Sequence, residues 1–341
     1  MRVEKYKDII EKYPNAIFVD LRTELEYEEN TIPGAINIPI LSNEERAEVG
    51  TIYKQRSKEL AIEKAIIYTS EKLPDIFIKL RNIAKDSKLL VVFCARGGMR
   101  SSSVASLFSS LHFNIVKLDM GYKGYRHHIN KYLPIELEKV KFIGLYGKTG
   151  TGKTKILKEL KLMNIDILDL EGCANHRGST LGSVGLSKQN SQKTFESLVY
   201  DSLIKRNSNT IFIEGESKRI GNVILPSYLY EKLINSTKIL IESSIDYRTK
   251  TIHDEYINEY FTKKDFMVKL NWLNKYISKK DIEDLITHLK NNDYDYVIKK
   301  LMINYYDIKY NVNSYSYERI FYNTNDKKCG EDILKFFNID I

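Results

Sequence analysis

At 341 residues the chain is longer than one hydrophobic core usually organises, and its 43% hydrophobic and 29% charged residues argue against extended disorder. Its formal net charge of +8 permits a nucleic-acid partner without requiring one, because lysine-rich, asparagine-rich and tyrosine-rich usage produces the same charge. Three scattered cysteines argue against a disulfide framework and a zinc site. No apolar run nears the roughly 20 residues of a membrane span, so we expect a cytoplasmic protein without a membrane partner.

The first predicted strand is Ala16–Asp20, followed by a polar helix over 24–30 and a turn at Pro33-Gly34 before another short strand. Asp20 and Arg22 stand at the carboxyl end of the first strand, where α/β folds place loop chemistry. A salt bridge that braces the loop is the favoured interpretation of this pair. Residues 42–84 are predicted to be mainly helical, with these side chains available to a core: Leu60, Ile62, Ile66, Ile67, Ile76, Ile78 and Leu80.

The chain is organised around Cys94. The apolar run Leu89–Phe93 predicts a buried strand, and Met99–Leu107 predicts a helix that follows it. Cys94 therefore ends a strand beside a helix N-terminus, where unpaired N–H groups and the positive dipole end favour a thiolate and a bound anion. A buried structural cysteine is the alternative.

The residues around Cys94 support the reactive interpretation. Gly97 and Gly98 are expected to allow the backbone conformation of an anion cradle. Arg96 and Arg100 would add cationic, fork-shaped donors around the thiolate, which suits an incoming phosphate-like or sulfonate-like group.

Strand and helix patterns alternate over 16–126 and predict a three-layer α/β domain with a mainly parallel sheet. Three segments, Asp20-Leu21-Arg22, Ile32–Pro39 and the Cys94 loop, resemble a rhodanese domain, the sulfurtransferase module whose loop cysteine carries a persulfide. Asn30-Thr31 departs from the Gly-His of many rhodaneses, so that position offers no imidazole.

A polar, proline-interrupted segment over 127–136 is interpreted as the boundary between two domains, 1–135 and 136–341. It contains His127 and His128, either metal ligands or, as is commoner for adjacent histidines without a carboxylate pair, exposed linker residues.

The second domain opens on a phosphate-binding loop. Phe142–Tyr146 predicts a buried strand, and residues 147–154 fit G-x-x-x-x-G-K-[ST] before a helix. Backbone N–H groups would cradle a diphosphate, Lys153 would reach its terminal oxygens and the Thr154 hydroxyl would hold Mg²⁺. The glycines of the expected phosphate site are Gly147, Gly150 and Gly152.

Two later hydrophobic segments are predicted to be strands that end in acids, Glu171 and Glu214, and Glu214 is the first candidate for a metal carboxylate. His176 and Arg177 lie in a polar loop after Glu171, where contact with substrate and simple loop packing are both open. The guanine-reading motif N-K-x-D is absent, which gives no support to a guanine-specific switch.

Residues 262–311 are predicted to be helical, with lysines, tyrosines and Trp272 interleaved. Aromatic rings with cations suit RNA binding, although a helix with a tyrosine-rich core face explains the same residues. The expected fold is an N-terminal rhodanese-like α/β domain followed by a P-loop NTPase-like α/β domain with a helical C-terminal part.

Motifs in both domains resemble bacterial tRNA 2-selenouridine synthases, and Gly215 departs where that family would have an acid. The motifs are Asn43–Gln55, Cys94–Ser101, Asp169–Gly172 with His176–Ser179, and Tyr305-Tyr306-Asp307. The resemblance implies that tRNA wobble 2-thiouridine is first alkylated with geranyl diphosphate. Selenium from selenophosphate, carried by Cys94 as a selanyl group, then replaces the S-geranyl group.

The implied partners are tRNA and an enzyme that supplies selenophosphate, and no tightly bound cofactor is expected. The residues leave open whether the P-loop binds a nucleotide or a prenyl diphosphate. Three alternatives use fewer of the motifs. A rhodanese-type sulfurtransferase in tRNA thiolation with an NTP-binding domain needs only Cys94, and a P-loop kinase or NTPase needs only Lys153. A non-catalytic tRNA-binding regulator needs neither residue.

Overall fold

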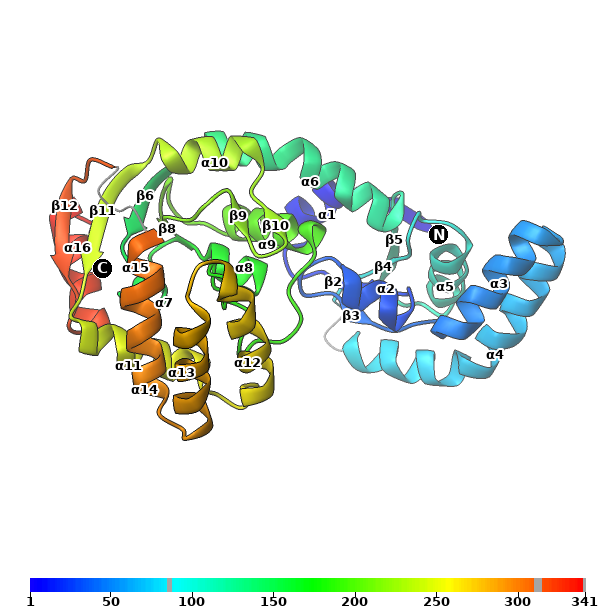
Figure 1. The fold of residues 1–341 in the computed structure, drawn as a ribbon. Helices are drawn as coiled ribbons and strands as arrows, with labels where there is room; N and C mark the ends of the chain where they lie inside the picture. The colour runs from blue at the N-terminus through cyan, green and yellow to red at the C-terminus, as the bar shows by residue number, and fades with distance from the viewer. Residues whose placement is uncertain (85–87, 310–314, 340–341) are drawn as a thin grey trace. The chain divides into compact units, whose positions relative to one another are not determined.

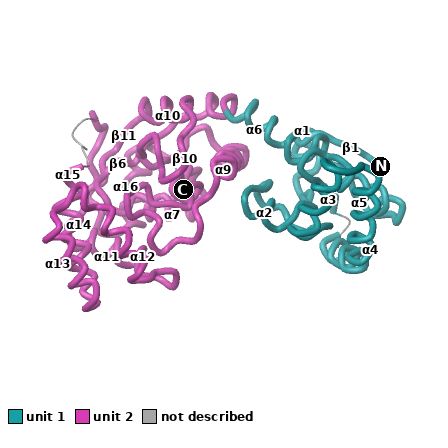
Figure 2. Tube along the Cα trace, turned by 45° about the vertical axis from the view of Figure 1, so that its right-hand side comes forward, with its two compact units in different colours: residues 1–133 teal, residues 134–341 magenta. Residues whose placement is uncertain are grey.

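The computed structural model describes residues 1–84, 88–309 and 315–339, and the chain divides into two compact units, Met1–Leu133 and Pro134–Ile341 (Figure 2). Each unit contains a parallel sheet covered by helices (Figure 1). The predicted α/β class with parallel sheets is confirmed in both.

In the described part of unit 1, five parallel strands lie in the order β1-β5-β4-β2-β3. β4 is central and every one of its residues is buried, as its unbroken apolar run predicts. The strands are β1 (Arg2–Glu4), β2 (Ile17–Asp20), β3 (Ile36–Asn37), β4 (Leu90–Phe93) and β5 (Ile115–Leu118). The helices are α1 (Tyr6–Lys12), α2 (Glu24–Glu29), α3 (Asn43–Gln55), α4 (Lys58–Ile83), α5 (Met99–Ser110) and α6 (Gly121–Glu138), the last of which ends in unit 2.

The helices over 42–84 are present, but part of the core predicted for them is wrong. Ile76 and Leu80, near the end of α4, pack on the sheet side. α4 also packs on α3, a helix that itself buries no residue. Four apolar side chains of α4 are exposed: Leu60, Ile66, Ile67 and Ile78.

Residues 127–136, interpreted from the sequence as the boundary between two domains, lie inside α6. Tyr125, Ile129, Leu133 and Leu137 recur every four residues and are all buried, which makes the segment one face of an amphipathic helix. Pro134 is accommodated within the helix.

In the described part of unit 2, five parallel strands lie in the order β12-β11-β6-β8-β7, so the strand before the phosphate loop pairs directly with the strand that ends in Glu214. The strands are β6 (Lys141–Tyr146), β7 (Ile167–Leu168), β8 (Thr210–Glu214), β11 (Thr237–Glu242) and β12 (Arg319–Tyr322), with β9 (Arg219–Ile220) and β10 (Val223–Ile224) in a separate antiparallel pair. The helices beside the sheet are α7 (Lys153–Leu162), α8 (Leu170–Ala174), α9 (Gln192–Ile204), α10 (Ser227–Ile234), α11 (Ile245–Tyr256) and α16 (Asp326–Phe337).

One predicted strand of unit 2 is shorter than expected. β7 ends at Leu168, and the Asp169 carboxylate accepts a hydrogen bond from Gly172 N at 2.6 Å, which caps α8. Glu171 therefore lies in a helix rather than at the end of a strand.

The helical C-terminal part is confirmed over its described residues, and the predicted helical residues 310 and 311 lie outside them. It consists of α12 (Lys263–Asn271), η2 (Trp272–Lys275), α13 (Lys279–Lys290), α14 (Tyr294–Leu301), the π-helix η3 (Met302–Tyr306) and α15 (Asp307–Lys309). Its core is separate from the sheet core and includes Leu270, Leu273, Leu285, Val297 and Met302. Among the described residues, no helix combines the length and apolar character needed to cross a bilayer.

Candidate functional site

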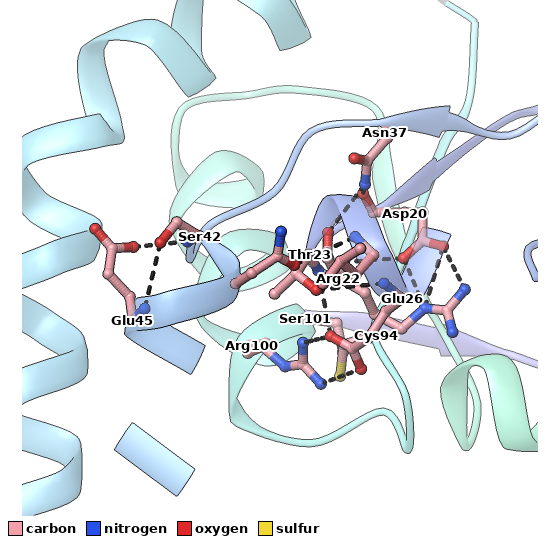
Figure 3. Close-up of polar contacts among 12 residues, drawn as sticks. Asp20, Arg22, Thr23, Glu26, Asn37, Ser42, Glu45, Cys94, Arg100 and Ser101 are labelled. Atoms are coloured by element: carbon pink, nitrogen blue, oxygen red, sulfur yellow. Dashed lines mark hydrogen bonds and ion pairs between the residues drawn. The ribbon is translucent and has the colours of Figure 1, made fainter. Parts of the chain in front are cut away.

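The Cys94 thiol lies between β4 and α5, in a loop whose backbone is bonded to the start of α6. Cys94 Sγ is 3.2 Å from Ser101 Oγ, and both residues are almost fully buried (Figure 3). Tyr122 N donates to Cys94 O at 2.9 Å, and Lys123 N donates to Ala95 O at 3.0 Å. The loop is therefore rigidly held around the sulfur.

The surroundings of Cys94 favour its thiolate. Burial alone would raise the pKa of the thiol, but the Ser101 hydroxyl, the Arg100 charge and backbone N–H groups of Ser101 and Arg96 outweigh it and lower the pKa. The contribution of Arg96 is thus made by its backbone. Cys173 and Cys329 are also free and buried, and burial raises their pKa, for Cys329 to about 12.

Arg100 is shared between the thiol and a carboxylate. Its Nη1 lies 2.7 Å from Glu26 Oε2, and the Glu26 carboxylate also accepts a bond from Thr23 N at 3.2 Å in the capping box of α2. Burial opposes ionisation of Glu26, but the Arg100 ion pair prevails and lowers the pKa of that carboxyl. The loop thus carries a guanidinium already oriented beside the sulfur (Figure 3).

The two glycines expected to shape the loop differ. Gly97 has φ +65°, and a Cβ there would lie 3.0 Å from Gly121 N, so glycine is required. Gly98 has φ −86° and nothing within 4 Å of a Cβ position, so its backbone does not require glycine. Gly121 is the additional requirement, because a Cβ there would lie 2.1 Å from Cys94 O.

Asp20 and Arg22 form the predicted brace. Arg22 Nη2 lies 2.6 Å from Asp20 Oδ2 and also donates to Asn30 O at 2.6 Å. The Arg22 guanidinium lies 4.3 Å from the centre of the Tyr122 ring. Both charged residues are buried. The pair therefore ties the loops next to Cys94 together.

The phosphate loop connects β6 to α7, and Gly147, Gly150 and Gly152 all have positive φ. Lys153 Nζ donates to Gly147 O at 2.8 Å, which curls the ammonium over the loop. Thr154 Oγ1 donates to Glu171 Oε2 at 3.3 Å, so the helical position of Glu171 brings a carboxylate to the hydroxyl expected to hold Mg²⁺. Glu214 is fully buried and accepts from Glu171 N at 3.3 Å, while its Oε1 has no partner among the described residues.

Glu171, Glu214 and Glu216 share this end of the loop. Burial and the neighbouring carboxylates raise the pKa of Glu171 and of Glu214. Burial and the charge of Glu214 raise the pKa of Glu216 to about 7, although Lys153 opposes the shift. Burial and mutual repulsion therefore favour the protonated forms of these carboxyl groups more than in exposed glutamates.

The loop opens into a cavity of about 480 Å³ in unit 2. Lys153, Thr154, Glu171 and Glu216 line it. Its lining also includes six tyrosines: Tyr146, Tyr230, Tyr256, Tyr305, Tyr306 and Tyr315. Such a volume suits a small-molecule site in which charged groups hold one end of a ligand and aromatic rings the other.

The other predicted contacts fall in different places. Arg177 borders the cavity, but its guanidinium donates to Val184 O at 2.6 Å and to Glu255 O at 2.5 Å and lies over the Tyr256 ring. His176 is buried in the same loop, and burial lowers its pKa. Its Nδ1 has no hydrogen-bond partner among the described residues, and its side chain does not line the cavity. Glu214 does not line the cavity either.

His127 and His128 belong to α6. His127 is exposed, and the ring of His128 packs between those of Tyr6 and Tyr132, with centroids 4.9 and 4.4 Å away. Within residues 1–84, 88–309 and 315–339, no three or more His, Cys, Asp or Glu side chains gather as a metal site.

The sequence did not predict a site role for Glu216 or for four of the cavity tyrosines: Tyr146, Tyr230, Tyr256 and Tyr315. Glu216 lies just after the strand that ends in Glu214, and the tyrosines come from segments far apart in the chain. The Tyr305-Tyr306-Asp307 motif was the available signal, because both of its tyrosines reach the cavity.

A loop thiol in one unit and a phosphate loop in the other define a two-part protein, a rhodanese-like domain followed by a P-loop domain. The family model described as a rhodanese-like domain matches residues 2–128, and that described as the tRNA 2-selenouridine synthase AAA domain matches residues 140–337. The chain therefore belongs to the tRNA 2-selenouridine synthase family.

Named relatives agree with this assignment. The tRNA 2-selenouridine synthase of Sulfurovum sp. (strain NBC37-1) is 31% identical over 71% of this chain and 66% of its own length. That of Nitrosomonas eutropha is 31% identical over 70% of this chain and 62% of its own length. The chain thus spans somewhat less than two thirds of the length of these two relatives.

One solved structure is similar to part of the chain. The crystal structure of the N-terminal domain of a putative ATP/GTP binding protein from Clostridium difficile 630 is 46% identical over 37% of this chain and 98% of that chain, with a TM-score of 0.36.

Proposed function

We propose that this protein converts 2-thiouridine at the wobble position of tRNA into 2-selenouridine, with geranyl diphosphate and selenophosphate as the other substrates. The observation that carries the proposal is the pairing, on one chain, of a thiol with a lowered pKa and a phosphate loop that opens into a tyrosine-lined cavity. Membership of the tRNA 2-selenouridine synthase family supports the substrate class.

The first half-reaction is assigned to unit 2. The thiocarbonyl sulfur attacks the first carbon of the geranyl group, the carbon–oxygen bond to diphosphate breaks, and N3 of the base loses its proton. Lys153 and the N–H groups of the loop stabilise the charge of the departing diphosphate. The tyrosines and Ile252 give the isoprenoid chain an apolar surface.

The donor set at the loop fits Mg²⁺. The Thr154 hydroxyl and the Glu171 carboxylate are hard oxygen donors at one place, and Mg²⁺ is commonly held by one or two carboxylates together with substrate phosphates. A bound Mg²⁺ would neutralise charge on the diphosphate. Glu214, buried behind Glu171 and bonded to its N–H, would orient that ligand.

The second half-reaction is assigned to unit 1. The Cys94 thiolate attacks the phosphorus of selenophosphate, so that a sulfur–phosphorus bond forms, the phosphorus–selenium bond breaks and hydroselenide leaves. Hydroselenide then adds to carbon 2 of the base and geranyl thiolate leaves, more readily than the unalkylated sulfur would, and water releases phosphate from Cys94. A selanyl group on Cys94 would also need a two-electron oxidant, because selenium in selenophosphate is at the selenide level. Arg100 and the N-terminus of α5 hold the anionic donor.

The test is mass spectrometry of tRNA nucleosides from cells that carry the parent protein, Cys94→Ala or Cys329→Ala. We expect 2-selenouridine with the parent and with Cys329→Ala, and its loss with Cys94→Ala. Retained 2-selenouridine in tRNA from the Cys94→Ala cells would reject this role of Cys94. Dependence of 2-thiouridine itself on Cys94 would instead identify a sulfurtransferase in tRNA thiolation, which the rhodanese-like unit alone supports.

A further inference from the structure

The C-terminal helical part presents an unusual exposed strip between α12 and α13. Leu273 and Ile277 are buried and anchor the segment, while the residues between and beside them face outward. The side chains of Trp272 and Tyr276 are 56% and 58% exposed. We call the exposed residues Trp272, Lys275, Tyr276, Lys279 and Lys280 the aromatic–lysine strip.

The lysines of the strip are not neutralised. Lys275, Lys279 and Lys280 are exposed, and no described carboxylate pairs with them. The nearest acid in sequence, Asp281, accepts from Ser278 Oγ and is paired with Lys300 at 3.1 Å. The strip therefore joins two largely exposed aromatic side chains to three available positive charges.

The strip is continuous with the cavity of unit 2. Lys309 Nζ lies 3.5 Å from the centre of the Tyr276 ring, and the ring centres of Tyr276 and Tyr305 are 5.6 Å apart. Lys309 Nζ also donates to Tyr305 Oη at 2.9 Å, and both Lys309 and Tyr305 line the cavity. A ligand on the strip therefore lies at the edge of the site that holds the phosphate loop.

We infer that the aromatic–lysine strip binds the unpaired nucleotides that flank the modified uridine of the RNA substrate, an inference that rests on the proposed function. A base that enters a cavity must leave its stack, and its neighbours then need other surfaces. Exposed rings receive bases of any sequence, and lysines between them neutralise the phosphates. The occupant is single-stranded RNA of the anticodon loop, and Lys309 stands between it and the cavity.

The chain offers a built-in probe, because Trp272 is its sole tryptophan. The RNA used is an anticodon stem-loop with 2-thiouridine at the wobble position, titrated into the full chain while tryptophan fluorescence is recorded. Stacking of a base on the indole predicts saturable quenching, whereas an unchanged signal under conditions where the RNA binds would overturn the inference. This measurement needs no substitution.

Matched variants separate the strip from general charge. Trp272→Ala with Lys275→Ala and Lys279→Ala removes one exposed ring and two lysines from the strip. As the control, Tyr322→Ala with Lys327→Ala and Lys328→Ala also removes one exposed aromatic ring and two exposed lysines, from another surface of unit 2. We expect the first set to weaken stem-loop binding about ten-fold or more and to reduce the slope of log affinity against log salt by roughly 1, and the second to change neither substantially.

The outcomes keep this inference apart from the proposed function. If the parent forms 2-selenouridine and the strip variant keeps its RNA affinity and KM, the strip is not the RNA site although the function stands. If no 2-selenouridine forms while the strip variant still loses RNA binding, the site stands and the proposed reaction fails. Equal losses in both variant sets would reduce the strip to nonspecific charge.

Discussion

Arg248 on α11 and Asp307 on α15 form a bidentate ion pair, and Arg248 also bonds to the phosphate loop. The two bonds, Nη2 to Oδ1 and Nη1 to Oδ2, measure 2.5 and 2.9 Å, and Arg248 Nε donates to Thr149 O at 2.9 Å. Lys148 Nζ lies 3.4 Å from the same carboxylate. The helical part thereby fixes the conformation of the loop from outside.

Asp307→Ala should destabilise the protein by about 3 kcal/mol, because it leaves the buried Arg248 guanidinium without its partner. Affinity for inorganic diphosphate, the probe for the loop, should fall as well. Asp246→Ala is the control, since Asp246 pairs with Lys299 on the surface and should cost less than about 1 kcal/mol. Urea unfolding measures the difference, and similar losses in both variants would contradict the brace.

The ion pair also makes stability depend on pH. Burial opposes ionisation of Asp307, but Arg248 lowers the pKa of the carboxyl. The stability that Asp307 contributes is therefore present above the usual pKa of 3.8 and lost as pH falls through the lowered value.

Iodoacetamide should modify Cys94 before Cys173 and Cys329 near neutral pH, because its surroundings favour the thiolate while burial raises the pKa of the other two. Ser101→Ala removes a hydrogen bond to the sulfur and should slow labelling at pH 7 roughly two- to ten-fold, with a higher midpoint in the pH profile. Ser103→Ala, whose hydroxyl bonds only to backbone carbonyls among the described groups, should leave the profile unchanged. Peptide mass spectrometry gives the rates, and a midpoint unaffected by Ser101→Ala would disprove the role of this hydroxyl.

Lys153→Ala should reduce geranylation of 2-thiouridine by about 100-fold or more, because it removes the ammonium that stabilises the leaving diphosphate. Selenation of a tRNA that already carries the S-geranyl group should change far less, since no diphosphate leaves in that step. Each half-reaction is assayed with its own tRNA substrate, and the exposed Lys161→Ala serves as the control on the same helix. Equal losses in both half-reactions would indicate that the loop binds tRNA or a nucleotide needed for both.

Glu216→Gln should stabilise the protein relative to the parent, and increasingly so as pH rises from 5 to 8. The unfolded carboxyl ionises near 4.5, whereas Glu216 in the fold has a pKa of about 7, so the folded state retains a proton through this window and loses stability as pH rises. The difference should approach 1 to 3 kcal/mol at pH 8. Thermal unfolding across this range, with the exposed Glu283→Gln as a control, checks it. A pH-independent difference would show that Glu216 is ionised throughout.

Short, contiguous patterns were enough to predict the general architecture. Leu90–Phe93 and Phe142–Tyr146 form buried strands. Helices cover both faces of a parallel sheet, so a continuous apolar run is typical of its inner strands. Cys94 and Lys153 follow these strands directly, so their positions at strand-to-helix connections depend only on local geometry. The fold class and the family could be predicted because the patterns that carry them are short and contiguous in the sequence.

By itself, the sequence determined the two α/β units, the thiol loop and the phosphate loop. Only the tertiary structure decided which distant residues complete them, because burial and ion pairing depend on the layer that packs outside each element. It left apolar side chains of α4 such as Ile66 and Ile78 exposed, made residues 127–136 part of a helix, and placed Glu171 beside Thr154. Arg248 and Asp307 lie 59 residues apart, and no local pattern encodes a pair that forms only when α11 and α15 pack on the same loop.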